Sequence, residues 1–174
     1  MPRSPRFADP ARISVPWTVV LVLAVLLIWG DSCVPGEGSG ELSLAVLDWA
    51  RGLLDAVGLP SAWLTNFLVR KAAHFSEYAC LGALAQLAFR PAHARSVSRW
   101  AAVAAVLVAV PCADETIQLF VPGRSGMVTD VLIDLAGAFV GTAIAWAFAA
   151  RSARREGFPA DSRSFSADVK KSED

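Results

Sequence analysis

Apolar residues gather into long blocks along the chain, and shorter polar segments separate the blocks. The blocks cover residues 13–30, 70–89, 100–121 and 128–150. Each has close to the 20 residues that an α-helix needs to cross a bilayer core of about 30 Å. The pattern predicts an all-α, polytopic membrane protein with four transmembrane helices.

The first block has a second interpretation, because a basic leader precedes it as in a signal peptide. The residues that follow, Gly30-Asp31-Ser32-Cys33, make a poor cleavage site and a poor lipoprotein box. We therefore expect this helix to be retained. The chain then divides into a cytoplasmic N-terminal segment (1–12), a transmembrane domain (13–150) and a disordered cytoplasmic tail (151–174).

A helix of a different kind is expected at residues 41–58, after a glycine-rich loop at residues 31–40. Its apolar residues recur at helical spacing and are Leu42, Val46, Trp49, Leu53 and Val57. Charged residues interrupt it too often for a membrane span. We expect an amphipathic helix that lies in the membrane interface and ends at Gly58 and Pro60.

The last three blocks carry polar and ionisable residues, and the ionisable ones are costly inside a membrane and mark functional sites by default. They are Lys71, His74 and Glu77 near the start of one block, Asp114, Glu115 and Gln118 near the end of the next, and Asp130 and Asp134 near the start of the last. Successive spans cross in opposite directions, so these three ends share one side of the membrane. One polar cluster is expected there.

Arginines outside the blocks predict which side this is. They are Arg3, Arg6, Arg12, Arg90, Arg95, Arg99, Arg151, Arg154 and Arg155. With four crossings all these segments fall on one side, which the positive-inside rule makes cytoplasmic. Both termini are then cytoplasmic, and the polar cluster faces outward from the cytoplasmic (inner) membrane.

Composition agrees with a membrane protein and limits the partners. Hydrophobic residues make up 55% of the chain, against roughly 45–50% in soluble domains. The net charge of zero gives no general attraction to nucleic acid, so no nucleic-acid partner is expected. The cysteines Cys33, Cys80 and Cys112 form no CxxC pair and match no zinc site, and we expect no metal and no cofactor.

Helical spacing places the polar residues on shared faces. On the second span the shared face carries Lys71, His74 and Tyr78, with Glu77 beside it. On the third span it carries Pro111, Glu115 and Gln118. On the fourth span it carries Asp130, Asp134, Gly137 and Gly141. The proline is expected to kink its helix, and the two glycines form a small-xxx-small pattern that lets another helix approach closely.

Taken together and in order, these motifs resemble the VanZ-like family of bacterial membrane proteins. The motifs are Lys71-x-x-His74-x-x-x-Tyr78, Asp114-Glu115-x-x-Gln118-x-Phe120-x-Pro122-x-Arg124, and Asp130-Val131-x-x-Asp134-x-x-Gly137-x-x-x-Gly141. The resemblance covers residues 15–150, and the chain has Asp134 where the family often has Asn. It implies a membrane location and a link to resistance against the glycopeptide teicoplanin, and it implies no particular reaction.

One function for the cluster is binding the headgroup of a membrane lipid or lipid-linked envelope precursor. Lys71 and Arg124 would hold a phosphate or carboxylate, because arginine offers a bidentate fork and lysine a point charge. The carboxylates would hold cationic or hydroxyl groups. The expected ligand-binding residues are Lys71, Tyr78, Asp114, Gln118, Arg124, Asp130 and Asp134.

A second function is an enzyme that modifies such a lipid by acid–base chemistry. His74 would act as general base, and Glu115 or Glu77 would orient it or act as acid. A divalent metal on His74, Glu77, Glu115 and Asp130 would be a variant of this scheme, but the spacing lacks a zinc signature. The sequence contains no activated-serine motif, P-loop or nucleotide fingerprint.

Two other interpretations stay open. The charges would simply lock the helices together if Lys71 pairs with Glu77 or Arg124 pairs with Asp130. A transporter or proton relay is less favoured, because no internal repeat is evident and four helices leave little room unless the chain forms a homo-oligomer.

Overall fold

The computed structural model describes residues 13–89 and 97–156, which are entirely helical apart from their connections. The all-α prediction is confirmed for this part of the chain. The predictions for residues 1–12, for Arg90 and Arg95, and for the tail from residue 157 lie outside the described residues.

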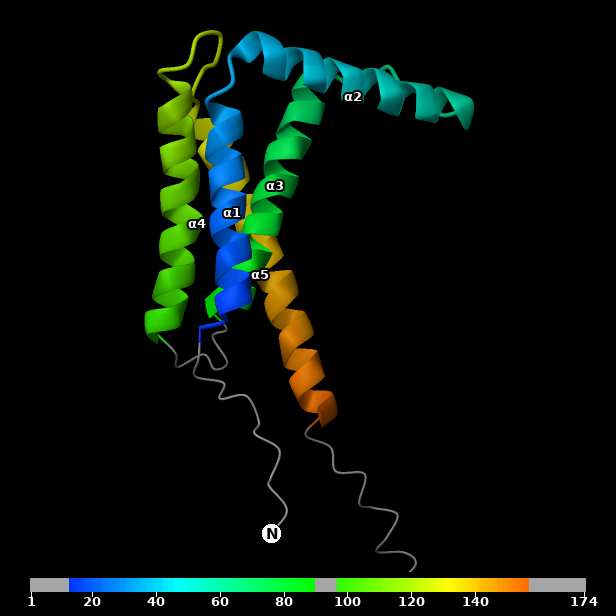
Figure 1. Cartoon of the computed structure of the whole chain (residues 1–174). Helices are drawn as coiled ribbons and strands as arrows, with labels where there is room; N and C mark the ends of the chain where they lie inside the picture. The colour runs from blue at the N-terminus through cyan, green and yellow to red at the C-terminus, as the bar shows by residue number, and fades with distance from the viewer. Residues whose placement is uncertain (1–12, 90–96, 157–174) are drawn as a thin grey trace, which may run out of the picture.

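The helices follow the predicted blocks. They are α1 (Val15–Ser32), α2 (Gly36–Ala56), α3 (Asn66–Phe89), α4 (Val97–Gln118) and α5 (Val128–Glu156). Figure 1 shows α1, α3, α4 and α5 running along one another as a bundle, with α2 lying across one end. This is the arrangement expected for four helices that pack as a bundle and one amphipathic helix beside them.

α2 begins at Gly36, so residues 36–40 are helical and the predicted loop at residues 31–40 is too long. A packing contact explains the difference. The Gly36 N–H donates to the Pro122 carbonyl oxygen at 3.0 Å, and a Cβ on Gly36 would lie only 1.9 Å from the Gly123 oxygen. The close backbone contact fixes a helix start where intrinsic propensity favours a loop.

Other helix ends also differ from the prediction by a few residues. α3 begins at Asn66 rather than residue 70, because the Thr65 hydroxyl accepts the Leu68 N–H at 3.3 Å and caps the helix. α4 ends at Gln118 rather than residue 121. α5 continues beyond residue 150 to Glu156, so residues 151–156 are helical where the tail was expected to be disordered. α4 runs through Pro111 without a break, and the kink there stays a prediction.

The predicted glycine pattern forms the most extensive helix contact, which joins α3 and α5. A Cβ on Gly137 or Gly141 would lie 2.3 Å or 1.8 Å from carbonyl oxygens of α3. Gly82 meets the Ala138 oxygen in the same way, at 2.0 Å. The polar face of α5 is therefore also its packing face, as expected.

Large apolar side chains cover the outside of the bundle. Leu27 is 73% exposed and Phe139 is 70% exposed. α1, α4 and the Val128–Ser152 part of α5 are each long and apolar enough to cross a membrane. A lipid environment would cover such a surface. The described residues thus form a membrane protein with three helices that qualify as spans by length and composition.

α3 does not meet the same criterion, because Arg70, Lys71 and Glu77 lie in its first half. Its 24 residues would nevertheless extend about 36 Å. It also packs against α1, α4 and α5 rather than standing apart. Four transmembrane spans therefore stay a prediction.

α2 has the expected amphipathic character. Its predicted apolar face is left uncovered by the described residues, and Trp49 at its middle is 70% exposed. Arg51 on the same helix donates from Nε and Nη2 to the Leu64 carbonyl oxygen, at 3.0 and 2.6 Å. This contact ties α2 to the connection that leads into α3.

The glycine contact generates a matched test. Gly141→Ala should lower the free energy of unfolding by about 1–3 kcal/mol, because the new methyl group collides with the α3 backbone. Gly30→Ala is the control, since nothing lies within 4 Å of a Cβ there. Thermal unfolding in detergent measures both. Equal melting temperatures for the two variants would contradict the packing described.

Candidate functional site

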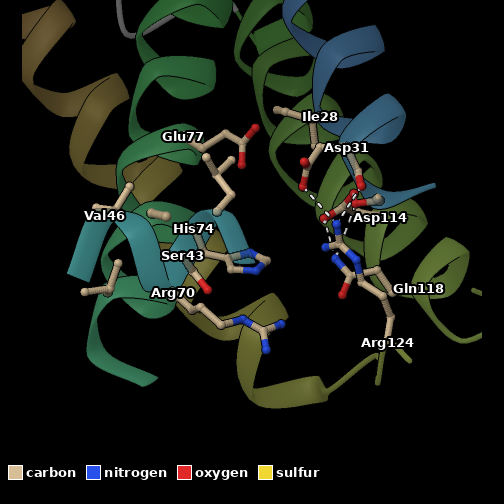
Figure 2. Close-up of a pocket in the computed structure, with 14 residues that line it drawn as sticks. Ile28, Asp31, Ser43, Val46, Arg70, His74, Glu77, Asp114, Gln118 and Arg124 are labelled. Carbon is tan, nitrogen blue, oxygen red and sulfur yellow. Dashed lines mark hydrogen bonds and ion pairs between the residues drawn. The ribbon is translucent and has the colours of Figure 1, made fainter. Parts of the chain in front are cut away.

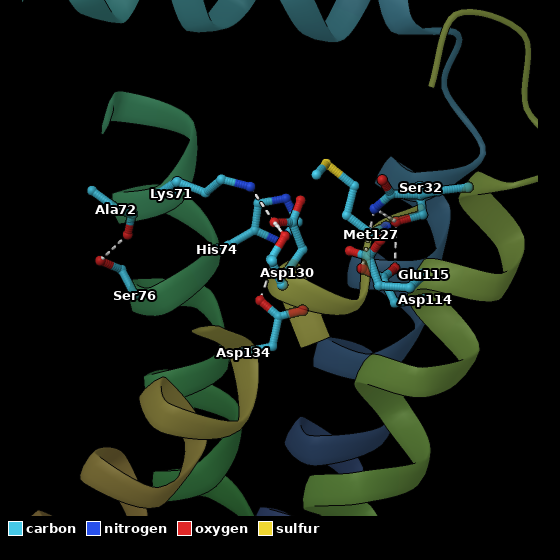
Figure 3. A network of polar contacts seen from close by, with 12 residues as sticks. Ser32, Lys71, Ala72, His74, Ser76, Asp114, Glu115, Met127, Asp130 and Asp134 are labelled. Atoms are coloured by element: carbon cyan, nitrogen blue, oxygen red, sulfur yellow. Dashed lines mark hydrogen bonds and ion pairs between the residues drawn. The ribbon is translucent and has the colours of Figure 1, made fainter. Parts of the chain in front are cut away.

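The polar ends of three helices meet at the end of the bundle beneath α2, as the sequence predicted (Figure 3). The start of α3, the end of α4 and the start of α5 contribute most of the side chains. The end of α1 is a fourth contributor that the sequence did not predict, through Asp31 and Ser32.

Lys71 is engaged in an ion pair with Asp130, which joins α3 to α5. Its ammonium group also lies over the Phe67 ring, 5.1 Å from the ring centroid. The predicted pairing of Lys71 with Glu77 is therefore wrong. Because Asp130 already neutralises it, Lys71 is poorly placed as the main anion-binding group.

Arg124 fixes the end of α1 in place. Its guanidinium donates to the carbonyl oxygens of Val34 at 3.0 Å and Asp31 at 2.6 Å, and to the Asp31 carboxylate at 3.1 Å. The predicted pair of Arg124 with Asp130 is wrong. Cationic side chains at a helix C-terminus stabilise the carbonyl groups left without helical partners there, so Arg124 has a structural role besides facing the site.

His74 and Asp134 form a second contact between α3 and α5. The imidazole Nδ1 lies 3.2 Å from Asp134 Oδ1, and the Asp134 side chain is 0% exposed. The sequence pointed to Glu115 or Glu77 as the group that orients His74. In the structure Asp134 takes this position.

Asp114 belongs to a buried polar contact between α1 and α4. The Ser32 hydroxyl donates to Asp114 Oδ1, and the Gln118 amide donates to Asp114 Oδ2 at 3.3 Å. The same amide group lies 3.3 Å from the Ser32 hydroxyl oxygen. Each carboxylate oxygen of Asp114 thus has a donor from a neighbouring side chain.

Glu115 holds the start of α5 through one of its two oxygens. Oε2 accepts the Met127 N–H at 2.7 Å. Oε1 is buried and has no hydrogen-bond partner among the described residues, and the same is true of Asp134 Oδ2. Unpartnered buried carboxylate oxygens are costly, because they have lost water without gaining a donor.

Four of these side chains converge on one point. His74, Asp114, Glu115 and Asp134 each offer one ligand atom, and these atoms all lie within 4.8 Å of one another. This differs from the metal set considered from the sequence, which had Glu77 and Asp130 in place of Asp114 and Asp134. Helix register places the two aspartates, rather than those residues, beside His74 and Glu115.

A pocket of about 300 Å³ opens next to this cluster, between α2 and the helices beneath it (Figure 2). Its polar lining has both signs of charge and consists of Asp31, Ser32, Ser43, Arg70, His74, Glu77, Asp114, Gln118 and Arg124. Its apolar lining comes from Ile28, Leu42, Val46, Val69 and Ala73. Figure 2 shows Arg70, His74 and Glu77 on one side, facing Asp31, Asp114 and Arg124 on the other.

The structure distributes the predicted site residues over several places. Those that line this pocket are His74, Glu77, Asp114, Gln118 and Arg124. Lys71 and Asp130 line a neighbouring hollow of about 280 Å³, which shares Arg70 and His74 with the pocket. Tyr78 lies deeper, fully buried in the hydrophobic core, and its hydroxyl has no partner among the described residues.

Arg70 is the main residue that the sequence analysis missed. It faces the pocket, is exposed, and makes no hydrogen bond or ion pair with the described residues. Arg70, His74 and Glu77 are spaced i, i+4 and i+7, so they share a helix face. That spacing was a signal, but Arg70 was taken as the first residue of the span rather than as part of the site.

Comparison with known proteins identifies a family. The sequence model of the VanZ/LLP1 family matches residues 17–149, which is most of the chain and includes every residue of the cluster. No curated protein and no solved structure matches the chain. The resemblance drawn from the motifs is confirmed.

The Lys71–Asp130 pair generates a test of how the cluster is held together. The side chains of Lys71 and Asp130 are 17% and 8% exposed. Removing one partner of a pair this far from water costs up to about 3–5 kcal/mol, because the other charge is left without a partner. We therefore expect Asp130→Ala to destabilise the protein strongly. The double variant with Lys71→Met should lose less than the sum of the two single changes.

The free energy of unfolding in mixed detergent micelles measures this coupling. The matched comparison is Asp48→Ala, which removes an exposed carboxylate from α2. If the effects of Asp130→Ala and Lys71→Met simply add, the ion pair contributes nothing to the α3–α5 contact.

Proposed function

The chain belongs to the VanZ/LLP1 family, and from that premise we propose that its polar pocket binds the headgroup of an envelope lipid or lipid-linked cell-wall precursor. The observation that carries this proposal is the mixed-charge pocket directly beneath an amphipathic helix whose apolar face is uncovered. Such a position suits a ligand with a charged head and an apolar tail.

We propose that α3 is the fourth span of a multi-pass protein of the cytoplasmic membrane. Its length and its packing against the three apolar helices support this. Arg99 near the start of α4 and Arg151 near the end of α5 belong to the helix ends away from the cluster. By the positive-inside rule that end is cytoplasmic, together with both termini, and the pocket opens on the outer face.

The depth of the pocket supports a headgroup as ligand. We place α2 in the membrane interface, because its apolar residues would otherwise face water. Leu42 and Val46 belong to this apolar face and also line the pocket. A bound headgroup would therefore have its first acyl carbons against these two side chains.

The charges of the pocket indicate the chemistry of the headgroup. Arg70 presents a guanidinium that lacks a partner in the described structure and can hold a phosphate or carboxylate in a bidentate way. Glu77 is an exposed carboxylate that can hold an amine or a hydroxyl group. A volume of about 300 Å³ is at the small end of ligand pockets, which suits a headgroup and not a whole lipid.

A specific observation favours an enzyme as the second candidate. His74 lies on the pocket wall with Nδ1 held by a buried carboxylate, which is the arrangement of an oriented general base. Glu77 lines the same pocket and would serve as the acid. In this scheme the bound lipid is chemically changed, whereas binding alone leaves it intact.

A purely structural charge network explains less of the cluster. Lys71 with Asp130 and Arg124 with Asp31 are indeed paired. However, these pairs leave Arg70 without a partner and leave two buried carboxylate oxygens unsatisfied. A role in glycopeptide resistance would follow from the binding proposal if the ligand is a cell-wall precursor.

Lipids that co-purify with the protein test the binding proposal. Arg70→Gln should reduce the bound envelope lipid several-fold, because it removes the pocket's unpaired cation. Arg151→Gln is the matched control, since it removes an exposed arginine at the opposite end of the bundle. Mass spectrometry of lipid extracts at equal protein yield gives the result. The same lipid profile in the wild type and both variants would contradict the proposal.

A lipid that is altered in membranes with the wild type, and unaltered with His74→Gln, would establish the enzyme instead. In that case Arg70→Gln should reduce the yield of product. A bound lipid that is identical in structure in both samples would leave binding as the function.

Cysteine labelling tests the proposed orientation. Cys33 is exposed at the end of α1 beside the cluster. In right-side-out spheroplasts, a variant that keeps Cys33 alone should react with a membrane-impermeant maleimide. A cysteine placed by Ser152→Cys in a background without the natural cysteines should react only after permeabilisation. The opposite pattern would place the pocket on the cytoplasmic side.

A further inference from the structure

We propose that His74, Asp114, Glu115 and Asp134 form a binding site for a divalent transition-metal ion such as Mn²⁺ or Zn²⁺. These side chains come from α3, α4 and α5, so the site would join three helices of the bundle (Figure 3). One ligand atom of each lies within 4.8 Å of the other three.

This spacing suits a metal ion. Oxygen and nitrogen ligands bind such ions at about 2.0–2.3 Å, so ligand atoms on opposite sides of an ion lie up to about 4.5 Å apart. Small shifts of the four ligand atoms toward one another would let them surround one ion. Imidazole with carboxylates is a ligand set that suits Mn²⁺ and Zn²⁺.

Unpartnered oxygens are an independent observation that points to a cation. Asp134 is 0% exposed and Glu115 is 5% exposed, and one carboxylate oxygen of each has no hydrogen-bond donor among the described residues. The other oxygen of Asp134 contacts His74, and the other oxygen of Glu115 accepts the Met127 N–H. Each carboxylate is thus held by one oxygen while its second oxygen is left for another ligand.

The charges around the cluster also indicate that a cation is needed there. Asp114, Glu115 and Asp134 bring three carboxylates together in a buried place. The basic groups on neighbouring elements are already used or lie elsewhere. Lys71 pairs with Asp130, Arg124 pairs with Asp31, and Arg70 faces the pocket.

His74 is then the one basic side chain within the cluster, and it cannot offset three negative charges. A divalent cation would supply the missing positive charge and use the free oxygens. The surrounding hydrogen bonds from Ser32 and Gln118 to Asp114, and from Met127 to Glu115, would orient the ligands.

The metal site stands independently of headgroup binding. His74 and Asp114 line the pocket, so an ion held by them would lie at its wall.

Metal content of the purified full chain tests the inference. The protein should carry a tag without histidine, be stripped with a chelator in detergent, and then be dialysed against MnCl₂ or ZnCl₂. We expect about one ion per wild-type chain, as for a site with a closed set of protein ligands. Asp134→Asn and Glu115→Gln should weaken binding at least ~10-fold. Asp48→Asn, on the exposed surface of α2, should bind like the wild type.

A spectroscopic measurement guards against variants that fail to fold. In the wild type loaded with Mn²⁺, electron spin-echo spectra should show coupling to an imidazole nitrogen, and His74→Gln should remove it. Far less than one ion per wild-type chain, or no nitrogen coupling, would overturn the inference and leave protons to neutralise the carboxylates.

The two proposals fail in different ways. Loss of lipid with Arg70→Gln, without any metal bound to the wild type, would keep headgroup binding and reject the metal site. Metal bound to both the wild type and Arg70→Gln, with no specific lipid in either, would keep the metal site and reject headgroup binding.

Discussion

The close contact between α3 and α5 is the constraint on which the rest of the structure depends. Three glycines let the two backbones approach until a single methyl group would not fit between them. The polar contacts of the cluster cross this same interface: Lys71 meets Asp130, His74 meets Asp134, and the Thr142 hydroxyl donates to the Gly82 oxygen at 3.0 Å. If these helices lay further apart, the ionisable groups of α3 and α5 would lie among apolar side chains without partners.

Some polar groups of the cluster have hydrogen-bond or ion-pair partners in the structure, and others have none. Arg124 and Lys71, which looked like free cations in the sequence, hold other parts of the protein. Arg70 and the free oxygens of Glu115 and Asp134 are left over. Burying polar groups costs free energy wherever they lack partners, so these remaining groups are the ones that structure alone does not explain.

Much of this arrangement could be predicted, because the positions of ionisable residues along the apolar blocks already bring three helix ends together. The pairings could not be, since they depend on how each helix is rotated: Asp134 rather than Glu115 reaches His74. The start of α2 was missed because it depends on backbone contact between Gly36 and Gly123, far apart in the chain. Asp31 was missed because the first span was taken to end at Gly30.

The contact between Asp31 and Arg124 has a consequence for how the protein is made. Arg124 follows Asp31 by 93 residues, so the ribosome completes the end of α1 long before its partner exists. Ser32 likewise waits for Asp114, 82 residues later. During synthesis these groups lack their partners, and Ser32 becomes buried only when α4 has packed against α1. The site is therefore the last part of the molecule to assemble, since Lys71 and His74 on α3 also wait for Asp130 and Asp134 on α5.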